Sequence, residues 1–220
     1  MPTSADILES LSNTTREWRS LAIVWHVACA LAAAAMFWRN RSPQRVVAIA
    51  IALPLVSVSA LAWWSGNPFN GLVFAAVATA LLLQTRGFDD RPVDMAGRLG
   101  LVSGALLVVF GLTYPHFVAA ESWWTYLYAA PFGLIPCPTI AVSIGASLMF
   151  GAFASRAWTL TLGLVALVYG GIGVLVLDVW VDVVLVAGAL FLFAEYFAER
   201  RAIPRMSPDR RGESAPIRGV

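Results

Sequence analysis

The sequence contains no lysine, so all 15 of its basic residues are arginine. A retinal chromophore held through a lysine Schiff base is therefore excluded. Charge of either sign is scarce: charged residues make up 13% of the chain, about half the share of a typical soluble domain, and apolar residues make up 59%. This balance excludes an ordinary soluble domain and predicts a multi-pass membrane protein.

Sequence motifs for nucleotide binding are also absent. The chain has no phosphate-binding loop and no dinucleotide fingerprint, and no loop predicted on the cytoplasmic side is long enough for a nucleotide domain. No motif identifies a catalytic residue, which favours a protein that is not an enzyme. Only the segment 199–220, rich in arginine and proline, resembles a nucleic-acid-binding tail. Attraction to anionic lipid headgroups explains it better, so we predict a disordered cytoplasmic tail and no nucleic-acid partner.

Seven apolar runs are long enough to cross a hydrocarbon core of about 30 Å, which takes about 20 helical residues. We predict an all-α bundle of about seven transmembrane helices within a domain at 20–198, preceded by a polar segment at 1–19 that suits an interfacial amphipathic helix. The segment 119–137 stays open between an interfacial helix, a re-entrant segment and a long loop. The runs lie at 20–38, 46–64, 69–85, 97–118, 138–155, 157–177 and 179–198.

The arginines alternate between the connecting loops. The loops after the first, third and fifth runs and the tail contain arginine, whereas those after the second, fourth and sixth contain no basic residue. The positive-inside rule then places the N-terminus outside and the C-terminus inside. Arg16 and Arg19 oppose this orientation, but Asp6, Glu9 and Glu17 lie close to them in the sequence.

Both histidines and both cysteines fall in the outer half of this topology. His26 lies about 9 Å inside the first span at 1.5 Å per residue, and Cys29 follows on the same helix face. An ionisable residue inside a span usually faces a partner or a cavity, so His26 is either functional or held by a buried hydrogen bond. Cys137 begins the fifth span, where a helix N-terminus favours a thiolate, and His116 ends the fourth.

Imidazole and thiolate groups together suit soft metal ions. His26, His116 and Cys137 are therefore candidate ligands for Cu(I), Zn(II) or another thiophilic ion, and the two histidines are alternative axial ligands for a haem. A disulfide between Cys29 and Cys137 is disfavoured because their predicted depths differ by roughly 10 Å.

Two further features of the outer side have simple structural explanations. Asp178 and Asp182 bracket the short turn before the last span, where we expect solvated carboxylates. The glycines of "YGGIGV" in the sixth span are expected to let helices pack closely.

Three stretches resemble a known group of proteins: "NPFNGLVFAAVATALLLQ" at 67–84, "YPH" at 114–116 and "GLIPCPTIAVSIG" at 133–145. They are similar to bacterial multi-pass membrane proteins of the domain of unknown function 6064 family, over about residues 7–193. Ile140 stands where a second threonine is expected after Thr139, and His26 is not part of the likeness. The resemblance implies a bacterial inner-membrane fold and no established activity. The matching residues are Asn67, Pro68, Tyr114, Pro115, Pro136, Cys137, Pro138 and Thr139.

Three functions stay open, and we favour the first. It is a transporter or permease-like protein that takes a small solute or ion at an outer site. The second is a membrane redox, haem or thiol protein that uses His26, His116 and Cys137. The third is a non-catalytic accessory or assembly subunit of a helix-mediated oligomer or membrane complex. The predicted ligand-binding residues are His26, Asn67, Tyr114, His116, Cys137 and Thr139.

Overall fold

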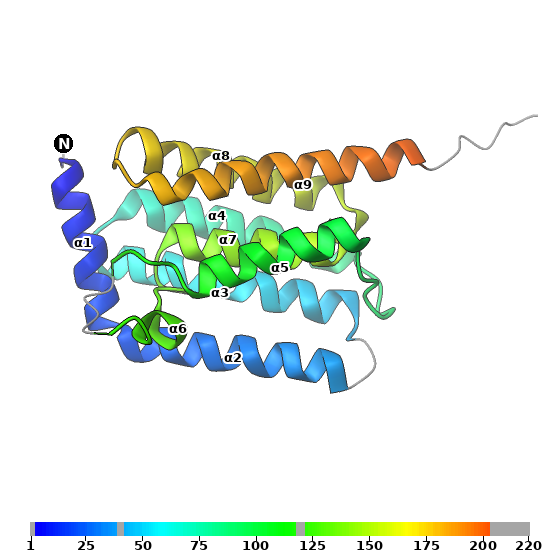
Figure 1. Ribbon diagram of the computed structural model, residues 1–220, viewed down its shortest axis with the longest axis horizontal. Coiled ribbons are helices and arrows are strands. Elements are labelled where there is room, and N and C mark those ends of the chain that lie inside the picture. Colours follow the sequence, from blue (N-terminus) through cyan, green and yellow to red (C-terminus); the bar gives the residue numbers. More distant parts are fainter. Residues whose placement is uncertain (1–2, 39–41, 118–121, 203–220) are drawn as a thin grey trace, which may run out of the picture.

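The computed structural model describes residues 3–38, 42–117 and 122–202. Within these ranges the chain is helical and forms no β-strand. Helix α1 (Ser4–Glu17) lies across one end of a bundle whose other helices run lengthwise in alternating directions (Figure 1). Those lengthwise helices are α2 (Arg19–Trp38), α3 (Gln44–Trp64), α4 (Pro68–Gln84), α5 (Arg98–Leu112), α7 (Pro136–Met149), α8 (Arg156–Leu175) and α9 (Val183–Ala202).

Five of the described helices, namely α2, α3, α4, α8 and α9, are long and apolar enough to cross a membrane, which supports the prediction of a membrane protein. Helix α5 has 15 residues and α7 has 14, so they are only about 22 and 21 Å long. The predicted spans 97–118 and 138–155 were therefore too long. The helical backbone ends at Thr113 in the first case and at Phe150 in the second, so the apolar residues beyond these points lie in loops and turns.

Helix α7 occupies the centre of the bundle, where it contacts α3, α5, α8 and α9. Its closest approach is to α5. A Cβ built on Gly104 would lie 2.4 Å from the carbonyl oxygen of Gly145, and one built on Gly145 would lie 2.5 Å from that of Gly104. The two backbones are therefore in direct contact, as is common for small residues between membrane helices.

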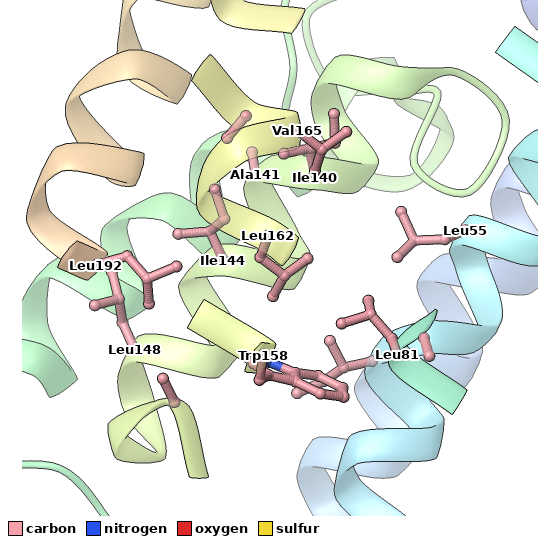
Figure 2. Close-up of a cluster of buried hydrophobic side chains, with 14 of the residues drawn as sticks. Leu55, Leu81, Ile140, Ala141, Ile144, Leu148, Trp158, Leu162, Val165 and Leu192 are labelled. Carbon is pink, nitrogen blue, oxygen red and sulfur yellow. The ribbon is translucent and has the colours of Figure 1, made fainter. Parts of the chain in front are cut away.

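The main core lies between α7, α8, α3 and α4, around the fully buried Trp158 (Figure 2). The indole nitrogen of Trp158 donates a hydrogen bond to the hydroxyl of Ser147 at 2.9 Å. Phe88 and Phe153 pack against the same indole ring. This aromatic group closes the interior of the bundle at the end opposite α1.

A left-handed turn, η2 (Gly151–Ala154), connects α7 to α8. Ala152, Phe153 and Ala154 have φ angles of 47°, 55° and 52°. L-residues with a side chain rarely adopt this conformation, which costs about 1–2 kcal/mol per residue. The turn brings the ring of Phe153 against Trp158, and that packing offsets part of the strain.

Helix α2 is the least enclosed of the lengthwise helices. Ala30, Leu31 and the alanines at 32–35 are all exposed, and Met36 is the residue of this half that packs against the core among the described side chains. At the other end the indole of Trp25 donates to the hydroxyl of Ser57 on α3 at 3.1 Å. Helix α2 is therefore attached to the bundle mainly near α1.

The remaining predicted segments have these outcomes. Helix α1 lies within the polar segment 1–19 and begins with a capping box formed by Thr3 and Asp6. In the segment 119–137, the described part contains the short helix α6 (Thr125–Ala129) and a buried turn at 130–135. The end of the predicted tail, residues 203–220, lies outside the described residues.

Candidate functional site

A cavity of about 540 Å³ lies between α1 and the end of the bundle that α1 crosses. Its walls come from α1, the α3–α4 turn, the start of α7 and the junction of α8 with α9. Most of its surface is apolar. The polar side chains that line it are Asp6, Ser10, Ser65, Asn67, Asn70, Cys137, Tyr169 and Asp182.

Asp182 is the most buried polar group of the cavity wall, with 1% of its surface exposed. The phenol of Tyr114 donates to its Oδ1 at 2.6 Å, and the thiol of Cys137 donates to its Oδ2 at 3.0 Å. Both carboxyl oxygens therefore act as acceptors, the pattern expected of a carboxylate. The prediction that Asp182 is a solvated residue of a turn was wrong, whereas Asp178 is exposed.

Asp182 can be buried because α8 has glycine where the carboxylate packs. A Cβ on Gly173 would lie 2.0 Å from Oδ2 of Asp182, and one on Gly170 would lie 3.1 Å from its carbonyl oxygen. The sequence pattern "YGGIGV" thus provides close packing, as expected from the sequence, and the group packed there is an ionisable side chain.

A second polar group, from α4 and α8, also lines the cavity. The phenol of Tyr169 donates to Oδ1 of Asn70 at 2.7 Å, and both side chains are at least nine-tenths buried. The backbone N–H of Asn70 donates to Oδ1 of Asn67 at 3.1 Å, which caps α4. Among the described residues the amide nitrogen of the Asn70 side chain has no hydrogen-bond partner, so it is available to a molecule in the cavity.

Helix α1 forms the outermost wall of the cavity through Asp6, Ile7, Ser10 and Leu11. Its first turn is tied to the end of α8 by a hydrogen bond of 3.0 Å from the hydroxyl of Ser4 to the carbonyl of Val176. Hydrogen bonding from the Thr3 backbone N–H, and then from its hydroxyl, holds the pKa of Asp6 below its usual range. Asp6 is therefore charged at neutral pH.

The cavity wall next to Cys137 is shaped by a tight turn before α7. Gly133 has a φ of +76°, and a Cβ there would lie 2.3 Å from the indole of Trp25, so both backbone and packing require glycine. Ile135 is extended, as expected before proline, and Pro136 occupies the first turn of α7, where a missing N–H costs nothing. Cys137 is thereby placed in the first turn, partly exposed toward the cavity.

The structure brings three of the predicted ligand-binding residues to this site. Asn67 and Cys137 line the cavity directly, and Tyr114, which is fully buried, holds Asp182. Thr139 does not line it. The hydroxyl of Thr139 accepts from the N–H of Gly133 at 2.9 Å and donates to the carbonyl of Ile135 at 2.8 Å, so this residue closes the turn before α7.

The two histidines also lie outside the cavity wall. The ring nitrogens of His26 lie 2.8 Å from the carbonyl oxygen of Ala22 and 2.9 Å from that of Leu112, so the ring ties α2 to the end of α5. His116 is exposed, and its ring packs edge-on against Phe117. It interacts electrostatically with Asp182.

The predicted metal site is not found in the described residues. No group of three or more histidine, cysteine, aspartate or glutamate side chains among them is arranged to hold a metal ion. Both ring nitrogens of His26 already face backbone carbonyls, which explains why this residue does not join Cys137. Cys29 and Cys137 are free thiols.

Sequence reasoning missed Asn70, Tyr169 and the buried state of Asp182. The pattern that points to Asp182 is the pair Gly170 and Gly173, three residues apart on α8, followed by a short turn. Asn70 and Tyr169 look like ordinary helix residues in the sequence, and only the packing of α4 on α8 brings them together.

Comparisons with models of protein families, with curated proteins and with solved structures find no match to this chain. The resemblance to the domain of unknown function 6064 family stays a prediction.

Proposed function

We propose that the chain is a seven-span membrane protein, with its N-terminus outside, whose outer cavity binds a small molecule in a permease-like cycle. The observation that carries this proposal is the cavity of about 540 Å³ beneath α1, which is within the usual range for small-molecule sites. Its polar groups lie within a mostly apolar lining, and a small number of placed polar groups is how such sites orient a ligand.

The distribution of charge supports the proposed orientation. At the bundle end opposite α1, arginines lie in the first turns of α3, α5 and α8 and after α4, at positions 45, 98, 156 and 86. The end with α1 contains Arg16 and Arg19 beside Asp6, Glu9 and Glu17. Excess arginine marks the cytoplasmic side, so the cavity opens outward.

Two features support transport over simple binding. The cavity lies at the α1 end, while at the other end of the described bundle Phe88, Phe153 and Trp158 pack against one another, as in an outward-facing state. The strained turn η2 lies within this aromatic closure, and strain of this kind is common at switch regions. The short helix α7 is surrounded by protein, which tolerates irregular backbone at membrane depth, whereas α5 packs along α7 and leaves Leu99, Leu106 and Val109 exposed on its other face.

The proposal is tested by the reactivity of Cys137 in a Cys29→Ala variant purified in detergent. A small uncharged reagent such as methyl methanethiosulfonate should modify Cys137 in the folded protein, because the thiol borders the cavity. Ser10→Trp places a large side chain in the cavity from the α1 wall and should strongly slow the modification of Cys137. Asn13→Trp, on an exposed position of the same helix, should leave the rate unchanged. Unreactive Cys137, or equal rates in the two tryptophan variants, would contradict an open cavity.

A further inference from the structure

The ionisable side chains that line the cavity are of one sign. Asp6 and Asp182 line it, whereas none of the described arginines or histidines does. In the described part of the chain no basic side chain forms an ion pair with either carboxylate; the ion pair found there joins Arg91 to Asp89. His116 interacts with Asp182 electrostatically from outside the cavity. The cavity is thus lined by two carboxyl groups and, among the described residues, by no basic side chain.

The carboxyl group of Asp182 belongs to the cavity lining, and both of its oxygens accept hydrogen bonds. Its two hydrogen-bond donors, the phenol of Tyr114 and the thiol of Cys137, are neutral groups. Burying a carboxylate is costly unless a positive charge compensates it, and neutral donors supply only part of that stabilisation. A cationic group in the cavity would supply the rest.

Three aromatic rings belong to the remaining wall. Phe69, Phe117 and Tyr169 line the cavity together with aliphatic side chains. The faces of such rings attract cations, with about 0.5–2 kcal/mol for each favourable contact. Aliphatic walls bind apolar groups, so the lining suits a molecule that combines both properties. The free amide nitrogen of Asn70 adds one donor for an acceptor atom of that molecule.

We propose that the ligand of this cavity is a small organic cation: a molecule with an ammonium group that lies near Asp182 and an apolar body that packs against the aromatic wall. This inference rests on the proposed ligand-binding role of the cavity. It disfavours small anions and carboxylic acids as ligands of the site, because the carboxyl groups of Asp6 and Asp182 line the cavity and no basic side chain of the described residues does.

The test compares two thiol reagents of similar size and opposite charge on Cys137, again with Cys29→Ala. They are 2-aminoethyl methanethiosulfonate, a cation, and 2-sulfonatoethyl methanethiosulfonate, an anion. In each reaction the Cys137 sulfur forms a disulfide with the reagent, sulfinate leaves and the thiol proton passes to the buffer. The ratio of the two rates, divided by the ratio for free cysteine in the same buffer, reports the electrostatic preference of the cavity.

We expect this normalised ratio to be roughly tenfold or more in favour of the cation, since a cleft lined by one sign of charge concentrates counter-ions by such factors. Asp6→Asn should lower the ratio while keeping a side-chain oxygen for the α1 cap. Glu9→Gln makes the same charge change on α1 outside the cavity and should leave the ratio unchanged. The Asp6→Asn and Glu9→Gln pair avoids Asp182, whose replacement could prevent folding.

A normalised ratio of one or below, with both reagents reactive, would overturn the cation inference and leave an open cavity. Failure of both reagents to modify folded protein, when the unfolded protein reacts, would instead overturn the proposed function. A second experiment compares how well small molecules bound in the cavity protect Cys137 from modification by methyl methanethiosulfonate. Phenethylamine should protect at lower concentration than 2-phenylethanol or phenylacetate, and equal or better protection by either of the latter would contradict the inference.

Discussion

Gly173→Ala is the sharpest test of how Asp182 is held. The new Cβ would lie 2.0 Å from Oδ2 of Asp182 and 2.7 Å from its Cβ and Cγ, whereas ordinary contacts begin near 3.4 Å. Because the root of the Asp182 side chain is involved, rotation of the carboxyl group cannot relieve the clash, and the junction of α8 with α9 must move. Overpacking of this kind costs about 1–3 kcal/mol.

The displaced carboxylate would also lose its hydrogen bonds to Tyr114 and Cys137, with a net loss of about 1 kcal/mol or more for each. Replacement of a helical glycine by alanine returns up to about 1 kcal/mol through helix propensity. The expected net loss in the free energy of unfolding is therefore about 2–4 kcal/mol. Its measure is unfolding in mixed micelles with increasing dodecyl sulfate, followed by circular dichroism.

Gly171→Ala is the matched control, two residues away on the same helix, because a Cβ at that position has no atom within 4 Å. It should be neutral or slightly stabilising. If the Gly173→Ala and Gly171→Ala variants unfold at the same dodecyl sulfate concentration, Asp182 does not pack against α8 as described.

Three further substitutions test separate parts of the structure. Tyr114→Phe leaves Oδ1 of the buried Asp182 without its donor and should lower the free energy of unfolding by about 1–3 kcal/mol. Tyr128→Phe, on an exposed ring, should change the free energy of unfolding by less than about 0.5 kcal/mol. Equal effects would contradict the buried hydrogen bond between Tyr114 and Asp182. Ala154→Gly removes the strain of a positive φ angle and should raise the thermal unfolding temperature. Ala187→Gly, at an exposed position of α9, should lower that temperature. A lower unfolding temperature in both variants would contradict the left-handed turn. His26→Leu removes the tie to α5 and should speed amide hydrogen exchange at the α1 end of α2 but not in α3; unchanged exchange would show that the ring does not anchor the helix.

The helical, membrane-spanning character of the chain was predictable because it depends on summed apolar content, which the sequence displays directly. The lengths of α5 and α7 were not. Apolar residues continue beyond Thr113 and beyond Met149, and hydropathy does not distinguish a helix from a buried turn. The left-handed conformation at Ala152 and Phe153 has no sequence pattern, because both residues ordinarily favour right-handed helix.

The candidate site was predictable in part, where residue type and position limit the chemistry. Cys137, between two prolines at a helix start, was bound to lie at a helix end, and Tyr114 lies at the same end of the bundle. The expectation that Asp182 is solvated was wrong, because the burial of a turn residue depends on the neighbouring elements that pack against it, here α8. A histidine within a span predicts a functional role, but the ring nitrogens of His26 face backbone carbonyls, so its contacts are structural.

The central claim is that the cavity beneath α1 opens to the outside of the membrane. It is tested most directly by modifying Cys137 of the Cys29→Ala variant in sealed right-side-out vesicles. The reagent is 2-(trimethylammonio)ethyl methanethiosulfonate, whose permanent charge keeps it on the side to which it is added. We predict rapid modification when the reagent is added outside. Modification only when the reagent is trapped inside, or from neither side, would contradict the account.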